Sequence, residues 1–397
     1  MSATTRSLLR PLIAGLCVLV LSGCVSTDSR PAKSVARLKS PPVIVPAEIV
    51  GGHFIVTLKW GNNGPWRFLV DTGSTTTLVS AEFARANSIG KASADHPSPI
   101  LVRSGSGDTV SLESTTISRL ELGEARLKNT PALIYDCDEL SAHFGQKIDG
   151  VLGFPLFRHM LLTLDYPRSR LVLQSPNGAN PLPGHTVHFN NDRRVPFIPV
   201  ELDGHPFIAL VDSGSDGALH LNPAGLHPRF ANGPRPGGTV ATLTGDHPLE
   251  VGRLAQDLTI GGYTLAQPVV ELTDELSSLG SGLLKNFRLT FDQSRNQVTF
   301  YRETDAPIVN EPMRSTGLSF RKLPAYWRVL GVVPGSPAEE NGVQTGDLVT
   351  RINGEPVAKW PLSRYDELAR TARRIEFTFL AGRQEMPVPI DTFTLMP

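Results

Sequence analysis

Two heptapeptides of this chain repeat each other in both pattern and chemistry. Residues 68–74 read Phe-Leu-Val-Asp-Thr-Gly-Ser, and residues 209–215 read Ala-Leu-Val-Asp-Ser-Gly-Ser. Each copy places one carboxylate, Asp71 or Asp212, directly after an apolar run typical of a β-strand. One turn of small polar residues after a strand is common in β-rich proteins, but two copies in matching context indicate an internal duplication.

The residues on both sides of each heptapeptide repeat as well. Segment 53–70 reads as two alternating strands around an Asn-Asn-Gly turn, and segment 196–211 as two strands around an Asp-Gly turn. Each hairpin leads into its carboxylate. Downstream, segment 151–165 aligns with segment 278–292 without a gap. The duplication therefore covers residues 53–165 and 196–292.

These motifs resemble the aspartic peptidases, in particular the bacterial retropepsin-like group. In that family each lobe offers an Asp-Thr/Ser-Gly loop above a strand that reads hydrophobic-hydrophobic-Gly, which Val-Leu-Gly at 151–153 matches. The second copy departs, because Ser278 occupies the first hydrophobic place and Asp216-Gly217 follows the second motif where only threonines follow the first. The resemblance implies a mainly β fold with two β-barrel lobes in one chain, so that dimerisation is not required to bring the two carboxylates together.

Two neighbouring carboxylates are sufficient to hydrolyse an amide without a metal, a cofactor or a covalent intermediate. Like charges about 3 Å apart cannot both ionise, so the pair shares one proton, as the aspartic proteases illustrate. The ionised member then activates water while the protonated member polarises the scissile carbonyl. We expect Asp71 and Asp212 to form this coupled pair, and the sequence leaves open which of them holds the proton.

The residues that follow each carboxylate have expected supporting roles. Gly73 and Gly214 are expected to let backbone amides approach the carboxylates. The family resemblance implies that the hydroxyls of Thr72 and Ser213 bond across the two lobes.

The second hydroxyl of each motif carries a separate expectation. If Ser74 and Ser215 donate to the carboxylates, they favour the ionised form and lower its pKa. That reasoning predicts an acid-shifted activity optimum.

A substrate cleft also needs a cover that excludes water and holds an extended peptide. Residues 102–110 form a Gly-rich hairpin tip between apolar residues, and residues 242–247 occupy a similar place in the second half. These segments are candidate flaps, with an ordinary exposed hairpin as the alternative.

The C-terminal part of the chain resembles a PDZ domain of the kind attached to bacterial envelope proteases. The resemblance rests on Pro-Gly-Ser-Pro-Ala at 334–338, Gly-Asp at 346–347 and Ile-Asn-Gly at 352–354. It implies that a peptide C-terminus binds free backbone amides and adds as a strand beside a helix at 365–371. The implied carboxylate-binding loop consists of Gly317, Leu318, Ser319 and Phe320. The alternative is that the module only packs on the protease.

The N-terminus predicts an envelope lipoprotein. Arg6 and Arg10 precede a short apolar run, and Leu-Ser-Gly-Cys at 21–24 resembles the bacterial lipobox, which implies cleavage of residues 1–23 and lipid on Cys24. Val25 after the cysteine points to the outer membrane, with the periplasm as the expected side, and a plain secretory signal is the alternative. Residues 24–42 read as a flexible tether.

Length and composition limit the possible domain organisation and fold class. The expected units are protease lobe 1 at 43–178, protease lobe 2 at 179–305 and the PDZ domain at 310–397. The 36 Gly and 33 Pro favour an all-β body, with residues 78–87 as the clear helical stretch in lobe 1. The 38 basic and 38 acidic residues balance, so the sequence lacks the basic excess that is typical of nucleic-acid-binding proteins.

Other reactive side chains are expected to be structural. Cys137 is the free thiol expected in the mature chain, and no cysteine-protease signature surrounds it, so a buried small side chain is the favoured interpretation. His185 and His188 stand in a loop-like stretch without a metal-binding motif and are expected to be solvated.

The sequence as a whole predicts an aspartic endopeptidase acting on protein or peptide substrates, with a PDZ domain that binds peptide C-termini. A non-catalytic peptide-binding lipoprotein that uses the same cleft and PDZ groove is the alternative. Retention of two like charges argues against the alternative, because holding them together costs stability.

Overall fold

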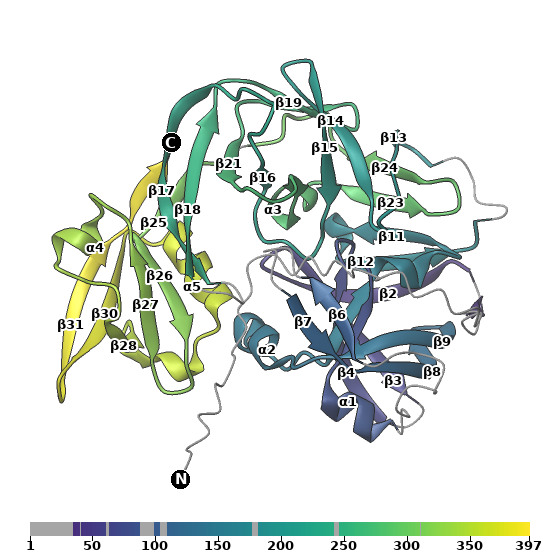
Figure 1. The fold of residues 1–397 in the computed structure, drawn as a ribbon, viewed down its shortest axis with the longest axis horizontal. Helices are drawn as coiled ribbons and strands as arrows, with labels where there is room; N and C mark the ends of the chain where they lie inside the picture. Colours follow the sequence, from purple (N-terminus) through teal and green to yellow (C-terminus); the bar gives the residue numbers. More distant parts are fainter. Residues whose placement is uncertain are drawn as a thin grey trace, which may run out of the picture.

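The computed structural model describes residues 35–39, 41–60, 63–87, 99–103, 109–176, 182–241, 246–309 and 311–397. The predicted signal peptide, Cys24 and residues 25–34 of the predicted tether lie outside the described residues. The tether prediction is wrong for residues 35–38, which form a strand that pairs antiparallel with residues 125–128. The described chain is mainly β, with two protease halves stacked on each other and the PDZ domain beside them (Figure 1). No helix in these ranges is long and apolar enough to cross a membrane.

The first half is built on the predicted hairpin. Strands β3 (His53–Trp60) and β4 (Asn63–Asp71) pair antiparallel, and β10 (Gly150–Gly153) runs parallel to β4 with Gly153 opposite Asp71. The buried strand therefore threads beside the strand that carries the carboxylate. The other elements of this half complete its barrel and cover it: β1 (Val35–Leu38), β5 (Thr77–Val79), α1 (Ala81–Ala86), β6 (Ile100–Arg103), β7 (Thr109–Leu112), β8 (Ser114–Leu122), β9 (Ala125–Ile134) and α2 (Asp138–Phe144).

The helix predicted over residues 78–87 is shorter in the structure. Leu78 and Val79 are fully buried in β5, where they pair with β10. Helix α1 begins only after Ser80, whose hydroxyl caps the helix by accepting a bond from the Phe83 amide at 3.0 Å. Sheet pairing therefore outweighs local helix preference at the start of this segment.

The second half repeats the plan. Strands β14 (Phe197–Leu202) and β15 (His205–Val211) form the predicted hairpin around Asp203 and Gly204, which have φ of 53° and 79°. Strand β22 (Ser278–Leu279) runs parallel to β15. The remaining strands and the helix of this half are β16 (Leu219–Leu221), β17 (Phe230–Ala241), β18 (Asp246–Leu254), β19 (Leu258–Ile260), β20 (Tyr263–Leu265), β21 (Val269–Leu272) and α3 (Ser281–Leu284).

A continuous antiparallel sheet joins the two halves. At its centre, β11 (Leu161–Asp165) pairs with β23 (Arg288–Asp292), and Thr163 faces Thr290 with their hydroxyl oxygens 2.9 Å apart. The order outward is the same on both sides: β12 and β2 flank β11, while β24 and β13 flank β23. The flanking strands are β2 (Val43–Val50), β12 (Arg170–Gln174), β13 (His185–His188) and β24 (Gln297–Tyr301). The duplicated strands are therefore direct partners across a pseudo-twofold axis.

The PDZ domain has its own core. Trp327, Phe320, Tyr365 and Phe377 pack with ring centroids 5.1–6.1 Å apart. The predicted helix is present and begins a turn earlier, as α5 (Leu362–Thr371). The other elements are β25 (Met313–Ser315), β26 (Leu318–Lys322), β27 (Trp327–Val332), α4 (Pro337–Glu340), β28 (Leu348–Ile352), β29 (Glu355–Pro356), β30 (Arg374–Ala381), β31 (Gln384–Asp391) and β32 (Phe393–Met396).

Candidate active site

The two repeated carboxylates meet at the junction of the halves. Asp71 ends β4 and Asp212 follows β15, and their side chains are 0% and 1% exposed. A Cβ placed on Gly73 would lie 2.5 Å from the Asp212 carboxylate, and one on Gly214 would lie 2.4 Å from Cγ of Asp71. Each carboxylate thus lies against the glycine of the opposite loop, where only a residue without a side chain fits.

Backbone amides hold both carboxylates. Asp71 Oδ1 accepts bonds from the amides of Gly73 at 2.8 Å and Ser74 at 3.0 Å, and Asp212 Oδ1 accepts one from Gly214 at 2.8 Å. Asp71 Oδ2 is buried and has no donor among the described residues unless the two carboxyl groups share a proton. The ionisation of each acid therefore depends on the state of the other.

Burial raises the pKa values of both carboxyl groups. Loss of water raises the pKa of Asp71 well above its usual value, and the charge of Asp212 raises it further, against the lowering effect of the Gly73 and Ser74 amides. Burial also raises the pKa of Asp212, although the Gly214 amide offsets part of this effect. A fully ionised pair is therefore unfavourable at this site.

The hydroxyls of Thr72 and Ser213 bond across the halves. The Thr72 amide donates to Ser213 Oγ at 3.0 Å, and the Ser213 amide donates to Thr72 Oγ1 at 2.9 Å. The same hydroxyls donate onward to the carbonyls of Val211 at 2.7 Å and Val70 at 2.9 Å. Four buried hydrogen bonds therefore hold the two catalytic loops together.

The predicted role of the Ser74 and Ser215 hydroxyls is wrong. Ser74 Oγ donates to the carbonyl of Thr76 at 2.8 Å, and Ser215 Oγ contacts His220 Nδ1 at 3.3 Å. Neither hydroxyl bonds a carboxylate of the pair, and the pKa values of the pair are raised rather than lowered. The argument for an acid-shifted optimum from these two hydroxyls therefore fails.

The loops are supported from beneath by the strands with a terminal glycine. A Cβ on Gly153 would lie 2.2 Å from the carbonyl oxygen of Thr76, and one on Gly280 would lie 2.2 Å from that of Gly217. Both contacts are closer than any side chain permits. The glycine is therefore required at both positions, including in the second half, where Ser278 departs from the hydrophobic pattern.

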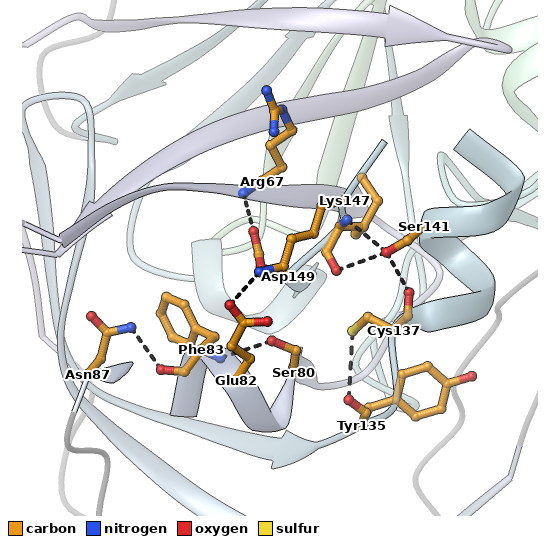
Figure 2. A network of polar contacts seen from close by, with 11 residues as sticks. Arg67, Ser80, Glu82, Phe83, Asn87, Tyr135, Cys137, Ser141, Lys147 and Asp149 are labelled. Atoms are coloured by element: carbon orange, nitrogen blue, oxygen red, sulfur yellow. Dashed lines mark hydrogen bonds and ion pairs between the residues drawn. The ribbon is translucent and has the colours of Figure 1, made fainter. Parts of the chain in front are cut away.

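A polar network supports the strand that enters beneath the first loop (Figure 2). Asp149 accepts a bond from the Arg67 amide at 2.9 Å and lies 3.5 Å from Lys147 Nζ, which also pairs with Glu82 at 2.6 Å. Cys137 lies in the same region, is 4% exposed, and has a pKa raised to about 12 by burial and by neighbouring carboxylates. Its thiol is therefore unreactive at neutral pH.

Both candidate flaps are hairpins with their tips outside the described residues. Strands β6 and β7 pair, as do β17 and β18, but residues 104–108 and 242–245 are not described. Strand β17 also lies against the PDZ domain, where the Thr239 amide donates to Ser319 Oγ at 2.9 Å. The predicted carboxylate-binding loop therefore contacts the second hairpin directly.

Sequence reasoning missed a charged cluster beside Asp212. Asp216 Oδ1 lies 3.4 Å from His53 Nε2 and 3.8 Å from His143 Nε2, and His220 Nε2 lies 3.0 Å from Glu271 Oε2. Asp216 was visible as a departure from the first motif, but its partners are distant in sequence. Among the described residues, no group of three or more His, Cys, Asp and Glu side chains is arranged to hold a metal ion.

Comparisons with known proteins identify two domain types. Residues 56–156 match an aspartyl protease family model, and residues 328–379 match a PDZ domain model. The chain is 27% identical over 97 residues to "Serine protease HTRA3" of Mus musculus. The matched region covers 24% of this chain and 20% of that protein. A crystal structure of the HtrA3 PDZ domain bound to a phage-derived ligand matches at 22% identity and a TM-score of 0.19, over 21% of this chain and 88% of that one. With the fold above, these matches show a mainly β chain that carries an aspartyl protease domain and a PDZ domain.

Proposed function

We propose that this chain is an aspartic-type endopeptidase in which Asp71 and Asp212 activate water. The observation that carries the proposal is the burial of two carboxylates from opposite halves, each against the glycine of the other loop. The ionised acid takes a proton from water while the protonated acid donates to the scissile carbonyl. The two acids then exchange roles as the amine leaves, and no acyl-enzyme forms.

The PDZ domain supplies a peptide-binding module in this proposal. Strand β26 is at the end of its sheet, so a peptide strand could pair with its outer edge, where the Tyr365 hydroxyl already donates to the Leu318 carbonyl at 3.2 Å and β17 contacts Ser319. The loop before it turns at Gly317, where φ is +87° and a Cβ would lie 2.3 Å from that of Ser336. The amides of Gly317 and Leu318 donate to Ser315 Oγ at 2.9 Å and to Thr316 Oγ1 at 3.3 Å, so in this proposal a peptide carboxylate displaces these hydroxyls when it binds the amides of residues 317–320.

The proposed setting is the bacterial cell envelope. Lipid on Cys24 would anchor the chain to the outer membrane, and residues 25–34 would span the distance between the lipid and β1. Protein or peptide substrates in the periplasm are then the expected targets.

The decisive experiment compares the intact chain with Asp71→Asn and Asp212→Asn. Each protein is incubated with a mixed peptide library between pH 4 and pH 8, and the products are sequenced by mass spectrometry. Internal cleavage by the unmodified chain, lost in both variants, supports the proposal. Equal cleavage by all three proteins refutes the assignment of the pair.

The alternative of a non-catalytic receptor has a distinct signature in the same experiment. A receptor retains bound peptides without cleaving them, with or without the substitutions. For the PDZ module, a peptide with a free C-terminus is expected to bind more tightly than its amidated form. Equal binding of the two forms refutes carboxylate capture.

A further inference from the structure

Asp216 joins the catalytic loop of the second half to the first half. It stands four residues after Asp212, where the first half has Thr75 instead of an acid. Both of its histidine partners come from the other half: His53 begins β3 and His143 lies in α2. We call these three side chains the His-Asp-His bridge. The bridge connects the halves in addition to the Thr72 and Ser213 hydroxyls and the pairing of β11 with β23.

Packing holds both rings in place. His53 is 2% exposed and meets Phe144 edge-on with ring centroids 5.2 Å apart. His143 meets the same ring edge-on at 4.8 Å. The Asp216 side chain, in contrast, is half exposed. Two rings fixed in the first half thus present nitrogen atoms to one carboxylate of the second half.

Charge makes the His-Asp-His bridge sensitive to protonation. Crowding raises the pKa of Asp216, but the charges of His53 and His143 outweigh it and hold the pKa well below its usual value. Burial lowers the pKa of His143, yet the charge and hydrogen bond of Asp216, with a further contribution from Asp366 of α5, raise it overall. Asp216 is therefore ionised throughout the neutral range, and His143 is the group whose charge changes.

The surrounding charges bias the catalytic pair toward one member. His220 of β16 carries a pKa that burial lowers but that Glu271 of β21 raises by charge and hydrogen bonding, with added effects from Asp212 and Asp216. The charges of His220 and His53 favour the ionised form of Asp212. Asp71 lacks a comparable cationic influence among its described neighbours.

We propose that His53 and His143 are positioning residues that act through Asp216, holding the loop of Asp212 against the first half and favouring Asp212 as the ionised member of the pair. This inference rests on the proposed function and extends it. Asp212 is then the base that takes the water proton, and Asp71 is the acid that donates to the substrate carbonyl. Neither histidine touches the substrate.

The pH dependence follows from the raised pKa of His143. The charged pair of His143 and Asp216 is fully present below the ordinary histidine pKa of about 6.5 and is lost as pH rises through the raised value. The PDZ domain contacts the same region, because Gly145 at the end of α2 lies against Pro361 and Lys322 Nζ donates to the Ala142 carbonyl at 3.3 Å. Asp366 of α5 raises the pKa of His143 when it is ionised, but burial and the charge of Asp216 raise the pKa of Asp366 itself to about 6, so this contribution is lost below that pH.

The test is the ratio of kcat between the unmodified chain and His143→Gln, measured from pH 5 to pH 8.5. Titrations that His143 does not influence affect both proteins equally and cancel in this ratio, so the remaining pH dependence comes from His143, including any shift that it causes in the catalytic pair. We expect a ratio of about 3–10 at pH 5, since about 1.4 kcal/mol of lost stabilisation is tenfold in rate, falling toward about 1 as His143 loses its proton. His143→Lys keeps a cation and is expected to exceed the unmodified chain at pH 8.5. A ratio that stays constant with pH, as a purely structural histidine gives, overturns the inference.

A double-mutant cycle tests whether the histidine acts through Asp216. If it does, His143→Gln has no further effect on kcat in the Asp216→Asn background, whereas His53→Gln keeps the part of its effect that comes from its own charge beside Asp212. Additive losses overturn the proposed connection. An NMR titration of His143 separates this inference from the proposed function, because its pKa is expected to fall in Asp216→Asn whether or not peptides are cleaved. Cleavage without that fall refutes the His-Asp-His bridge alone, and the fall without any cleavage refutes the peptidase proposal alone.

Discussion

Replacing Thr72 by valine should destabilise the junction of the halves by several kcal/mol. The substitution keeps the shape of the side chain and removes Oγ1, which accepts from the Ser213 amide and donates to the Val211 carbonyl. Thr72 and Ser213 are fully buried, so water cannot replace the lost partner. A buried polar group left unsatisfied costs about 1–3 kcal/mol, and two such groups give about 2–6 kcal/mol. That is a large share of the 5–15 kcal/mol typical of a folded domain, so the effect is readily measured.

Thr72→Ser is the matched control, because it keeps the hydroxyl and removes only a methyl group at a cost of about 1 kcal/mol. The assay is urea unfolding of both variants and the unmodified chain, followed by circular dichroism. The valine variant is expected to have the lowest free energy of unfolding, with the serine variant between it and the unmodified chain. A valine variant as stable as the serine variant would refute the argument that these buried hydrogen bonds hold the loops together.

Further predictions concern the catalytic pair, the PDZ contact and the lipid. Gly214→Ala places a Cβ 2.4 Å from Cγ of Asp71 and should lower kcat at least tenfold, measured with a cleaved library peptide. Because the pKa of Asp71 is raised in the folded chain, its contribution to stability is complete below about pH 4 and is lost as pH rises. The Asp71→Asn variant should therefore gain stability relative to the unmodified chain between pH 4 and pH 7, measured by thermal unfolding. Gly331→Ala places a Cβ 2.1 Å from Thr239 Oγ1 and should speed hydrogen exchange in β17, and Thr239→Gly in the same chain should restore protection. Cys24→Ser should move the expressed chain from the detergent phase to the aqueous phase in a two-phase partition, and unchanged partition would count against lipidation.

Local patterns predicted the elements that carry the site. Period-two alternation and turn residues gave both hairpins, and the structure forms each of them, with the Asp203-Gly204 turn in the left-handed conformation. The glycines at 73, 153, 214 and 280 were recognisable because each is required by a close approach that repeats in both halves. The PDZ strands and helix α5 followed from equally local motifs.

Contacts between distant segments escaped prediction. The Ser74 and Ser215 hydroxyls find Thr76 and His220 instead of the carboxylates, because the backbone amides already occupy Asp71 Oδ1 and Asp212 Oδ1. The partners of Asp216 lie 163 and 73 residues away in sequence, and no pattern links them to it.

The sequence by itself determined that two acidic turns end two equivalent hairpins, because strand alternation, turn glycines and short-range steric limits are properties of neighbouring residues. Only the tertiary structure decided that β11 pairs with β23, that each carboxylate lies on the glycine of the other half, and that His53 and His143 reach Asp216. These outcomes depend on how two separately encoded barrels dock, and docking is governed by the summed packing of a buried surface to which many distant residues contribute.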